Sequence, residues 1–172
     1  MDDLTRLALA AQAGDDEALA ALIRATQADV WRVCAHVAGR QRADDVTQDA
    51  FVRAWRSLPR FRADASVRTW LLAVARNTAI DALRNAARRP GTVALLELAG
   101  EAAADPAGEV TTASLLDGLE SDRRTALFLT QLLGLTYAEA AAVCGVPIGT
   151  IRSRVARARE DLAGDLGAAA GP

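Results

Sequence analysis

The chain of 172 residues contains no lysine, one histidine and two cysteines, and aromatic residues make up 4% of it. Two cysteines and one histidine do not complete the four-ligand set of a structural zinc site, so we expect no metal and no cofactor. Cys34 and Cys144 lie far apart in helical patterns, and we expect both to be reduced and buried. Apolar residues do not alternate at period two, so no strand is predicted.

Long hydrophobic runs and enzyme motifs are also missing. No apolar run approaches the ~18 residues of a membrane helix and no secretory signal is visible, so we expect a cytoplasmic protein without membrane insertion. The sequence has no P-loop, no histidine pair and no carboxylate cluster suited to two-metal chemistry. These absences argue against an enzyme and against a small-molecule substrate.

Alanine is abundant and brings the hydrophobic content to 51%. An alanine-rich chain with few aromatic residues favours helices over sheets, so we predict an all-α fold. In the helix predicted over 122–133, we expect Leu127, Phe128, Leu132 and Leu133 to face the core. Apolar residues at helical spacing predict helices from 4 to the break at Gly14, from there through Val37, then over 44–58, 67–89 and 122–133, and a pair between Thr136 and Leu162.

Charge is distributed unevenly along the chain, although the formal net charge is only −2. Residues 1–90 carry 14 arginines against 11 acids, whereas residues 91–114 carry four acids and no base. This acidic stretch, which is rich in alanine and glycine, predicts a flexible linker over 91–112. We therefore expect two small helical domains at 1–90 and 113–167, and a disordered tail at 168–172.

The segment from Thr136 onward has the sequence form of a helix-turn-helix. Thr136 and Glu139 fit a capping box at the start of a helix, and Gly145 suits its C-terminal end at positive φ. Pro147 suits the first position of the next helix, where its missing N–H costs nothing. Two short helices joined by a tight turn are typical of proteins that place the second helix in the DNA major groove.

The second helix of this pair separates into an apolar and a basic face. Ile151, Val155, Ala158 and Leu162 form the apolar stripe, while no acid occurs before Glu160. Small residues on the opposite face allow close approach to a groove, and arginines bind phosphates or guanine edges. The candidate DNA-binding residues here are Gly149, Thr150, Arg152, Ser153, Arg154, Arg157 and Arg159.

The N-terminal half contains two further polar segments. The helix over 44–58 has a polar flank that suits either solvent or a docked protein. Residues 60–89 combine arginines with Phe61 and Trp70. Such a combination fits single-stranded or melted DNA, whose bases stack on aromatic rings, but it equally fits core aromatics with scattered surface arginines. The residues alone leave both interpretations open.

Three groups of residues in this order resemble the bacterial sigma factors of the extracytoplasmic-function group. They are Asp45-x-x-Gln48-x-x-Phe51, then Arg68-Thr69-Trp70-Leu71, and finally Gly134–Ala141 together with Pro147–Arg154. The ordered set covers nearly the whole chain. The resemblance implies a protein that binds core RNA polymerase, directs it to promoter DNA and helps to melt the start site.

The resemblance also implies a role for each segment. A polymerase-docking helix would meet the clamp coiled coil of the largest catalytic subunit through Asp45, Gln48, Asp49 and Val52. Residues 60–68 would capture a base of the −10 element, residues 150–159 would read the −35 element, and the linker would thread near the RNA exit path. An anti-sigma protein is a further expected partner. The implied −10 contacts are Arg60, Arg62, Asp64, Ser66, Arg68, Trp70, Arg76, Asn77, Asp81, Arg84, Arg88 and Arg89.

Two other classes of protein compete with this hypothesis. A conventional dimeric repressor or activator would bind duplex operators through the helix-turn-helix, with half-sites about one helical turn apart. It would leave the 44–58 helix and the 60–89 segment unexplained. A pure adaptor would bind polymerase without reading a promoter, and would lose nothing when Arg152 and Arg157 are replaced by alanine.

Overall fold

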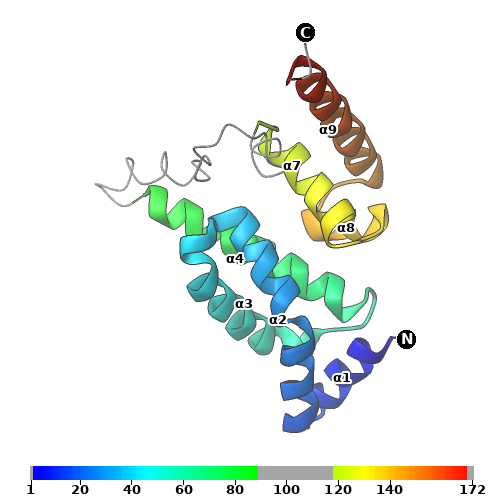
Figure 1. The fold of residues 1–172 in the computed structure, drawn as a ribbon. Helices are drawn as coiled ribbons and strands as arrows, with labels where there is room; N and C mark the ends of the chain where they lie inside the picture. Colours follow the sequence, from blue (N-terminus) through cyan, green and yellow to red (C-terminus); the bar gives the residue numbers. More distant parts are fainter. Residues whose placement is uncertain (1, 89–117, 170–172) are drawn as a thin grey trace. The chain divides into compact units, whose positions relative to one another are not determined.

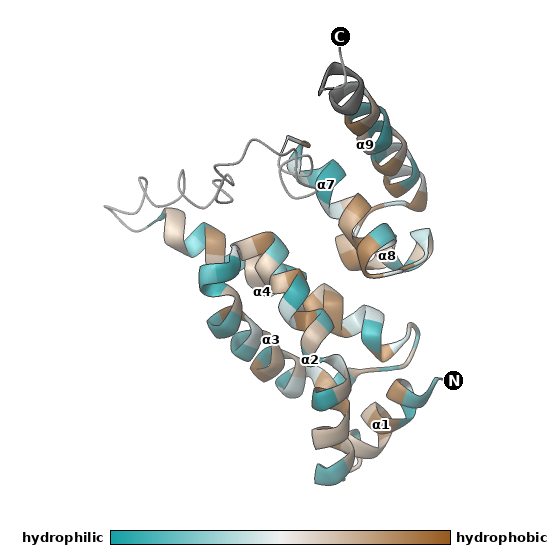
Figure 2. Cartoon of the chain, in the orientation of Figure 1, coloured by the Kyte–Doolittle hydropathy of each residue, from teal (hydrophilic) through white to brown (hydrophobic). Residues whose placement is uncertain are grey.

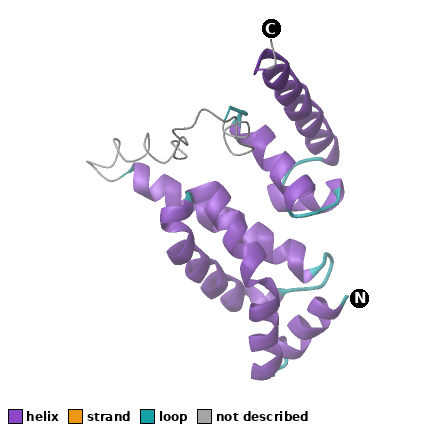
Figure 3. Ribbon diagram, in the orientation of Figure 1, coloured by secondary structure: helices purple, strands orange, loops and turns teal. Residues whose placement is uncertain are grey.

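The computed structural model describes residues 2–88 and 118–169, and every regular element within them is helical (Figure 3). The all-α prediction is therefore confirmed. The chain forms two compact units, one made mainly of residues before Ala87 and the other mainly of residues after it. Among the described residues, no helix combines the length and the apolar character needed to cross a membrane.

The first unit is mainly helical, and α2 packs against both α1 and α3. Two short 3₁₀ turns, Arg40–Arg42 and Leu58–Arg60, flank α3. The helix predicted to end at Arg89 stops at Ala87; Arg88 lies in a turn and Arg89 lies outside the described residues. The helices are α1 (Asp3–Gln12), α2 (Asp16–Ala38), α3 (Ala43–Ser57) and α4 (Val67–Ala87) (Figure 1).

Aspartates start the first two helices. The Asp2 carboxylate accepts a hydrogen bond from the Thr5 backbone N–H at 2.8 Å, and Asp15 accepts one from Ala18 at 2.9 Å. Each carboxylate satisfies an N–H group that has no partner inside its own helix. The Thr5 N–H bond favours the charged carboxylate and lowers the pKa of Asp2 below its ordinary 3.8.

Small residues let the helices of the first unit approach closely. Ala43, Ala50 and Ala54 of α3 are all buried, and α4 contributes Ala75 and Ala79. Larger side chains fill the space between them. Most hydrophilic residues of α3, whose positions are teal in Figure 2, are exposed. The most deeply buried large side chains of this unit are Val30, Val33, Cys34, Val67 and Leu72.

The second unit contains α7 (Ser121–Leu127), a π-helical segment (Phe128–Leu132), α8 (Tyr137–Cys144) and α9 (Ile148–Ala169). Helix α7 packs against α9. Two ion pairs join them: Arg154 with Asp122, and Arg123 with Asp161 at 2.7 Å. Ile151, Val155 and Ala158 of the predicted apolar stripe of α9 are buried, whereas Leu162, the fourth member, is only half-buried.

The predicted chemistry at both ends of α8 is present. Thr136 and Glu139 form the capping box: the Glu139 N–H donates to the Thr136 hydroxyl at 3.2 Å, and the Thr136 N–H donates to the Glu139 carboxylate at 2.8 Å. Gly145 has φ +67° and the Val146 N–H donates to the Ala141 carbonyl, the bonding pattern that ends a helix at a glycine. Pro147 stands one residue before the first residue of α9 rather than at it.

The predicted inner face of residues 122–133 is wrong at Leu132, whereas Leu127 and Leu133 are buried as predicted and Phe128 is half-buried. The regular helix ends at Leu127, and in the π-helical turn that follows, the Leu133 N–H donates to the Phe128 carbonyl. The wider turn rotates the later side chains, so Leu132 is 61% exposed while Leu129 is buried. The Thr130 hydroxyl donates to the Ala126 carbonyl at 2.8 Å within this turn.

The predicted tail is also corrected, since α9 continues to Ala169. A single glycine costs a helix about 1 kcal/mol relative to alanine, and the neighbouring alanines are strong helix formers. Gly167 therefore does not end the helix. The final residues 170–172 and the predicted linker at 91–112 lie outside the described residues, so the predictions made for them stay predictions.

Candidate nucleic-acid interface

The exposed face of α9 is basic and carries small side chains. Arg152 and Arg157 are exposed and make no hydrogen bond or ion pair within residues 2–88 and 118–169. Gly149 and Ser153 are exposed beside them, and the Ser153 hydroxyl is turned onto its own helix, donating to the Thr150 carbonyl at 3.0 Å. The face therefore carries two guanidinium groups that have no partner within the described residues. The small side chains beside them let the helix backbone come close to a DNA groove.

The other predicted basic residues of α9 are bonded within the unit. The Arg154 side chain is 23% exposed and pairs with Asp122 of α7. Arg159 donates to the Gln131 side chain at 3.3 Å. Thr150 is half-buried. Arg154 thus holds α9 to α7, and Arg152 and Arg157 remain the better placed of these arginines for an external partner.

The loop between η2 (Leu58–Arg60) and α4 exposes a short run of residues around Ala63. Arg62 and Asp64 are exposed, whereas Phe61 is buried, with its ring centroid 5.1 Å from that of Trp70. Ala63 has φ +58°, a left-handed conformation that costs an alanine roughly 1–2 kcal/mol. Trp70 therefore packs inward behind this loop, and the loop itself presents polar side chains outward.

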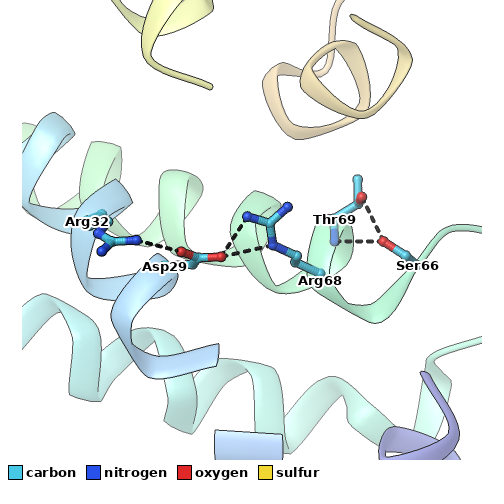
Figure 4. Close-up of polar contacts among 5 residues, drawn as sticks. All are labelled: Asp29, Arg32, Ser66, Arg68 and Thr69. Atoms are coloured by element: carbon cyan, nitrogen blue, oxygen red, sulfur yellow. Dashed lines mark hydrogen bonds and ion pairs between the residues drawn. The ribbon is translucent and has the colours of Figure 1, made fainter. Parts of the chain in front are cut away.

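Residues at the start of α4 are held by neighbours (Figure 4). The Ser66 hydroxyl accepts the Thr69 N–H at 3.2 Å and so caps α4. The Arg68 guanidinium donates twice to one Asp29 oxygen, at 2.9 and 2.7 Å, while Arg32 reaches the other oxygen at 3.1 Å. Two of the predicted DNA contacts, Ser66 and Arg68, thus fasten the helix that carries the others.

The remaining predicted contacts follow α4 toward its C-terminal end. Asp81 pairs with Arg53 of α3 at 2.7 Å, so it joins two helices. Arg76 is half-buried, and Arg89 lies outside the described residues. Besides Arg62 and Asp64, the exposed members of the predicted set among the described residues are Arg60, Asn77, Arg84 and Arg88.

Helix α3 presents the predicted docking residues on its outer side. Asp45, Gln48 and Asp49 are exposed and make no hydrogen bond or ion pair within the described part of the chain. Val52 is 48% exposed on the same helix. An exposed apolar side chain flanked by carboxylates and an amide is typical of a surface that binds another protein.

Sequence reasoning predicted Val52 but missed Trp55 and the hollow beside it as parts of this surface. Trp55 is 44% exposed, and beside it a hollow of about 480 Å³ is lined by side chains of α2, α3 and α4. The helical spacing of Gln48, Val52 and Trp55, at i, i+4 and i+7, places all three on one side and was the available signal. The lining residues are Leu19, Leu22, Ile23, Phe51, Val52, Ala54, Trp55, Arg56, Leu58, Trp70 and Leu71.

The two cysteines differ in how deeply they are buried. Cys34 is fully buried and its burial raises the pKa of its thiol, while Cys144 is only half-buried, which corrects the expectation for that residue. No group of three or more histidine, cysteine, aspartate or glutamate side chains in residues 2–88 and 118–169 is placed to hold a metal ion. What the surfaces offer is binding through charge and apolar contact.

A capped helix, a glycine turn and a following basic helix are the elements of a helix-turn-helix protein. Comparison with known families agrees: residues 22–89 match the model for sigma-70 region 2, and residues 112–162 match that for sigma-70 region 4. The ECF RNA polymerase sigma factor SigC of Mycobacterium tuberculosis is 50% identical over 94% of this chain and 90% of its own. The ECF sigma-E factor of Escherichia coli is 33% identical over 88% and 87%.

Solved structures give the same result. The structure of CnrH in complex with the cytosolic domain of CnrY is similar with a TM-score of 0.73, at 32% identity over 96% of this chain and 99% of that one. The chain belongs to the extracytoplasmic-function group of RNA polymerase sigma factors. It directs transcription initiation by RNA polymerase, and the conventional repressor is not the favoured alternative.

Proposed function

We propose that the two units divide promoter recognition between them. The second unit reads the −35 element through α9, and the first unit docks on polymerase and opens the −10 element. The observation that carries the proposal is the pair of unengaged arginines, Arg152 and Arg157, on an α9 face that is otherwise small and polar. We further propose that residues 91–112 act as the linker, which lets two weak modules gain affinity through effective concentration.

At the −35 element, Arg152 and Arg157 approach the major groove together with Gly149 and Ser153. Arginine binds guanine edges bidentately and also binds phosphates, and small neighbours let the helix sit deep. Arg154 and Arg159 contribute by holding α9 in place through Asp122 and Gln131. Thr150 lies at the border of this surface.

At the −10 element, the loop with Arg62 and Asp64 receives an extruded base. Unstacking a base costs a few kcal/mol, part of which a binding loop recovers. The exposed Arg60, Asn77, Arg84 and Arg88 follow the DNA backbone, and Arg76 and Arg89 extend this set. Trp70, Ser66, Arg68 and Asp81 support the surface from within.

Polymerase docks on the outer side of α3. Asp45, Gln48 and Asp49 offer polar contacts and Val52 an apolar one, and the resemblance assigns this surface to the clamp coiled coil of the largest catalytic subunit. The neighbouring Trp55 widens the apolar contact. Because the enzyme supplies much of the grip on DNA, a chain of net charge −2 suffices as its promoter-reading subunit.

Regulation by a partner protein is the last part of the proposal. The sigma factor RpoE in complex with the anti-sigma factor NepR from Bartonella quintana is similar to this chain, with a TM-score of 0.65 at 27% identity over 81% of this chain. We expect an anti-sigma protein to bind this chain as well. The protein acts in the cytoplasm, where it binds polymerase and promoter DNA. It has no catalytic activity of its own.

Run-off transcription tests the function directly. Purified core polymerase with this protein on fragmented genomic DNA should give discrete start sites that core polymerase alone does not. The double variants Asp45→Ala/Gln48→Ala and Arg152→Ala/Arg157→Ala should each abolish them. Gln27→Ala, at an exposed position of α2, serves as the control.

Two results would redirect the assignment. Tight binding of duplex operators without polymerase, and no new transcripts, would establish a conventional regulator. Full activity of the Arg152→Ala/Arg157→Ala variant would establish an adaptor that does not read the −35 element.

A further inference from the structure

Helix α1 lies outside the matched region 2, which begins at residue 22, yet it touches both ends of the exposed loop. The Gln12 side-chain amide donates to the Leu58 carbonyl at 3.0 Å and to the Phe61 carbonyl at 3.2 Å. At the other end, the Val67 N–H donates to the Thr5 hydroxyl at 3.1 Å. One helix thus bonds the backbone before and after the loop.

The two contacts come from one face of α1. Thr5 and Gln12 are seven residues apart, which is nearly two helical turns, so their side chains point the same way. Ala8 and Ala11 between them are buried, which keeps this face close to the rest of the unit. The Thr5 hydroxyl is itself oriented, since it donates to the Asp2 carboxylate at 2.9 Å. A side chain that is fixed in this way positions what it binds.

The bonded groups are those that the loop cannot satisfy by itself. The Val67 N–H belongs to the first turn of α4, where no carbonyl of the same helix is available. Between the two anchors, Ala63 holds a left-handed backbone that an alanine does not choose freely. The ends of the loop are therefore constrained, and its shape depends on where α1 places them.

We propose that Gln12 and Thr5 are positioning residues for promoter base capture, with α1 acting as a clamp on the loop that carries Arg62 and Asp64. This inference rests on the proposed function of that loop. The clamp sets the distance between Phe61 and Val67, and so the space available to an extruded base. Loss of the clamp reduces the discrimination between bases at the −10 element and leaves the affinity for polymerase unchanged.

The experiment uses holoenzyme and a promoter that it transcribes, with each of the four bases in turn at every −10 position. Gln12→Met keeps the side-chain volume and removes the donor. It should reduce the discrimination between best and worst base about fivefold, as expected for a lost neutral hydrogen bond. Gln27→Met at the exposed α2 position is the matched control, and affinity for core polymerase should be unchanged in both variants.

Thr5 supplies the second arm. Thr5→Val removes the hydroxyl and should reduce discrimination, whereas Thr5→Ser keeps it and should restore the wild-type value. A uniform loss of transcription for every base, which follows the thermal stability of each variant, would overturn the proposal and leave these residues with a structural role.

Loop variants separate this inference from the function on which it rests. Arg62→Ala and Asp64→Ala should change base discrimination themselves. If they do while Gln12→Met and Thr5→Val do not, the clamp is wrong and the loop assignment stands. If the loop variants change nothing, the base-capture function is wrong and the clamp proposal fails with it.

Discussion

Neighbouring arginines on α9 have different tasks because their environments differ. Arg152 is exposed and unengaged within the described residues, whereas Arg154 is mostly covered and bonded to Asp122. The sequence places both at the edge of the same basic face and does not distinguish them. The distinction comes from Asp122 on another helix, 32 positions earlier in the chain.

Substitution of these two arginines should therefore separate binding from stability. Arg152→Ala should weaken holoenzyme binding to a −35 duplex by about 1–3 kcal/mol, as for an arginine that contacts a base, and leave unfolding unchanged. Arg154→Ala should lower the free energy of unfolding by up to about 1 kcal/mol, since a partly exposed ion pair is removed. Urea denaturation and a fluorescence binding assay measure the two effects. Equal behaviour of the two variants would contradict the assignment.

Ala63 gives a second prediction at this scale. Glycine adopts positive φ without the Cβ penalty, but it also makes the unfolded chain more flexible, so Ala63→Gly should raise the free energy of unfolding by about 0.5 kcal/mol. Ala63→Val, with a branched side chain, should lower it by about 1 kcal/mol or more. Thermal unfolding of the two variants against wild type checks the sign of each change.

The sequence is most informative about where individual helices begin and end. The capping box of Thr136 and Glu139 and the glycine end at Gly145 are local features, and both were predictable because all their partners lie within a few residues. The π-helical turn was not predictable, since the i+4 and i+5 bonding patterns share the same apolar residues. Leu132 was misplaced for that reason, and the end of α9 was misplaced because an alanine-rich tail offers no stop signal.

Tertiary contacts at the candidate site escaped prediction for a different reason. The sequence identifies Arg68 and Ser66 as polar residues near Trp70, but not that Asp29 and the first turn of α4 bind them. Such pairs depend on how α2 and α4 meet, which residue spacing does not encode. The exposure of the proposed docking residues of α3 was easier to predict, because a helical face that is polar in sequence is exposed unless another element covers it.

The start of α1 should respond to pH in a defined direction. The pKa of Asp2 is lowered in the folded chain by the Thr5 N–H bond, so its contribution to stability is present above the unfolded value and is lost as pH falls through the folded pKa. Asp2→Ala should therefore be less stable than wild type at neutral pH, and the difference should shrink as pH falls below 3.8 and disappear once pH is below the folded pKa. Thermal unfolding across this range is the measurement. A difference that persists at the acid end would contradict this origin.

In the molecule as a whole, acidic and basic residues nearly balance, and this limits the affinity of the free chain for DNA. With a net charge of −2, the free chain should bind duplex promoters weakly, and holoenzyme should bind them well. For holoenzyme, the slope of log affinity against log salt changes by about 0.9 for each DNA phosphate that a variant no longer neutralises. Arg152→Ala/Arg157→Ala should therefore flatten the slope by up to about 1.8. A slope that stays the same would show that these arginines do not bind phosphates.

The rate at which Cys34 is alkylated reports how often the packed helices of the first unit open. Its thiol is completely enclosed and its pKa is raised by burial, so an alkylating reagent meets a thiolate only when the helices around α2 separate. The rate of modification then measures how often that unit opens, in the same way that amide exchange does. Binding of polymerase to α3, which packs on α2, should slow the alkylation of Cys34. A Cys144→Ser variant removes the second thiol, so the measured rate belongs to Cys34 alone.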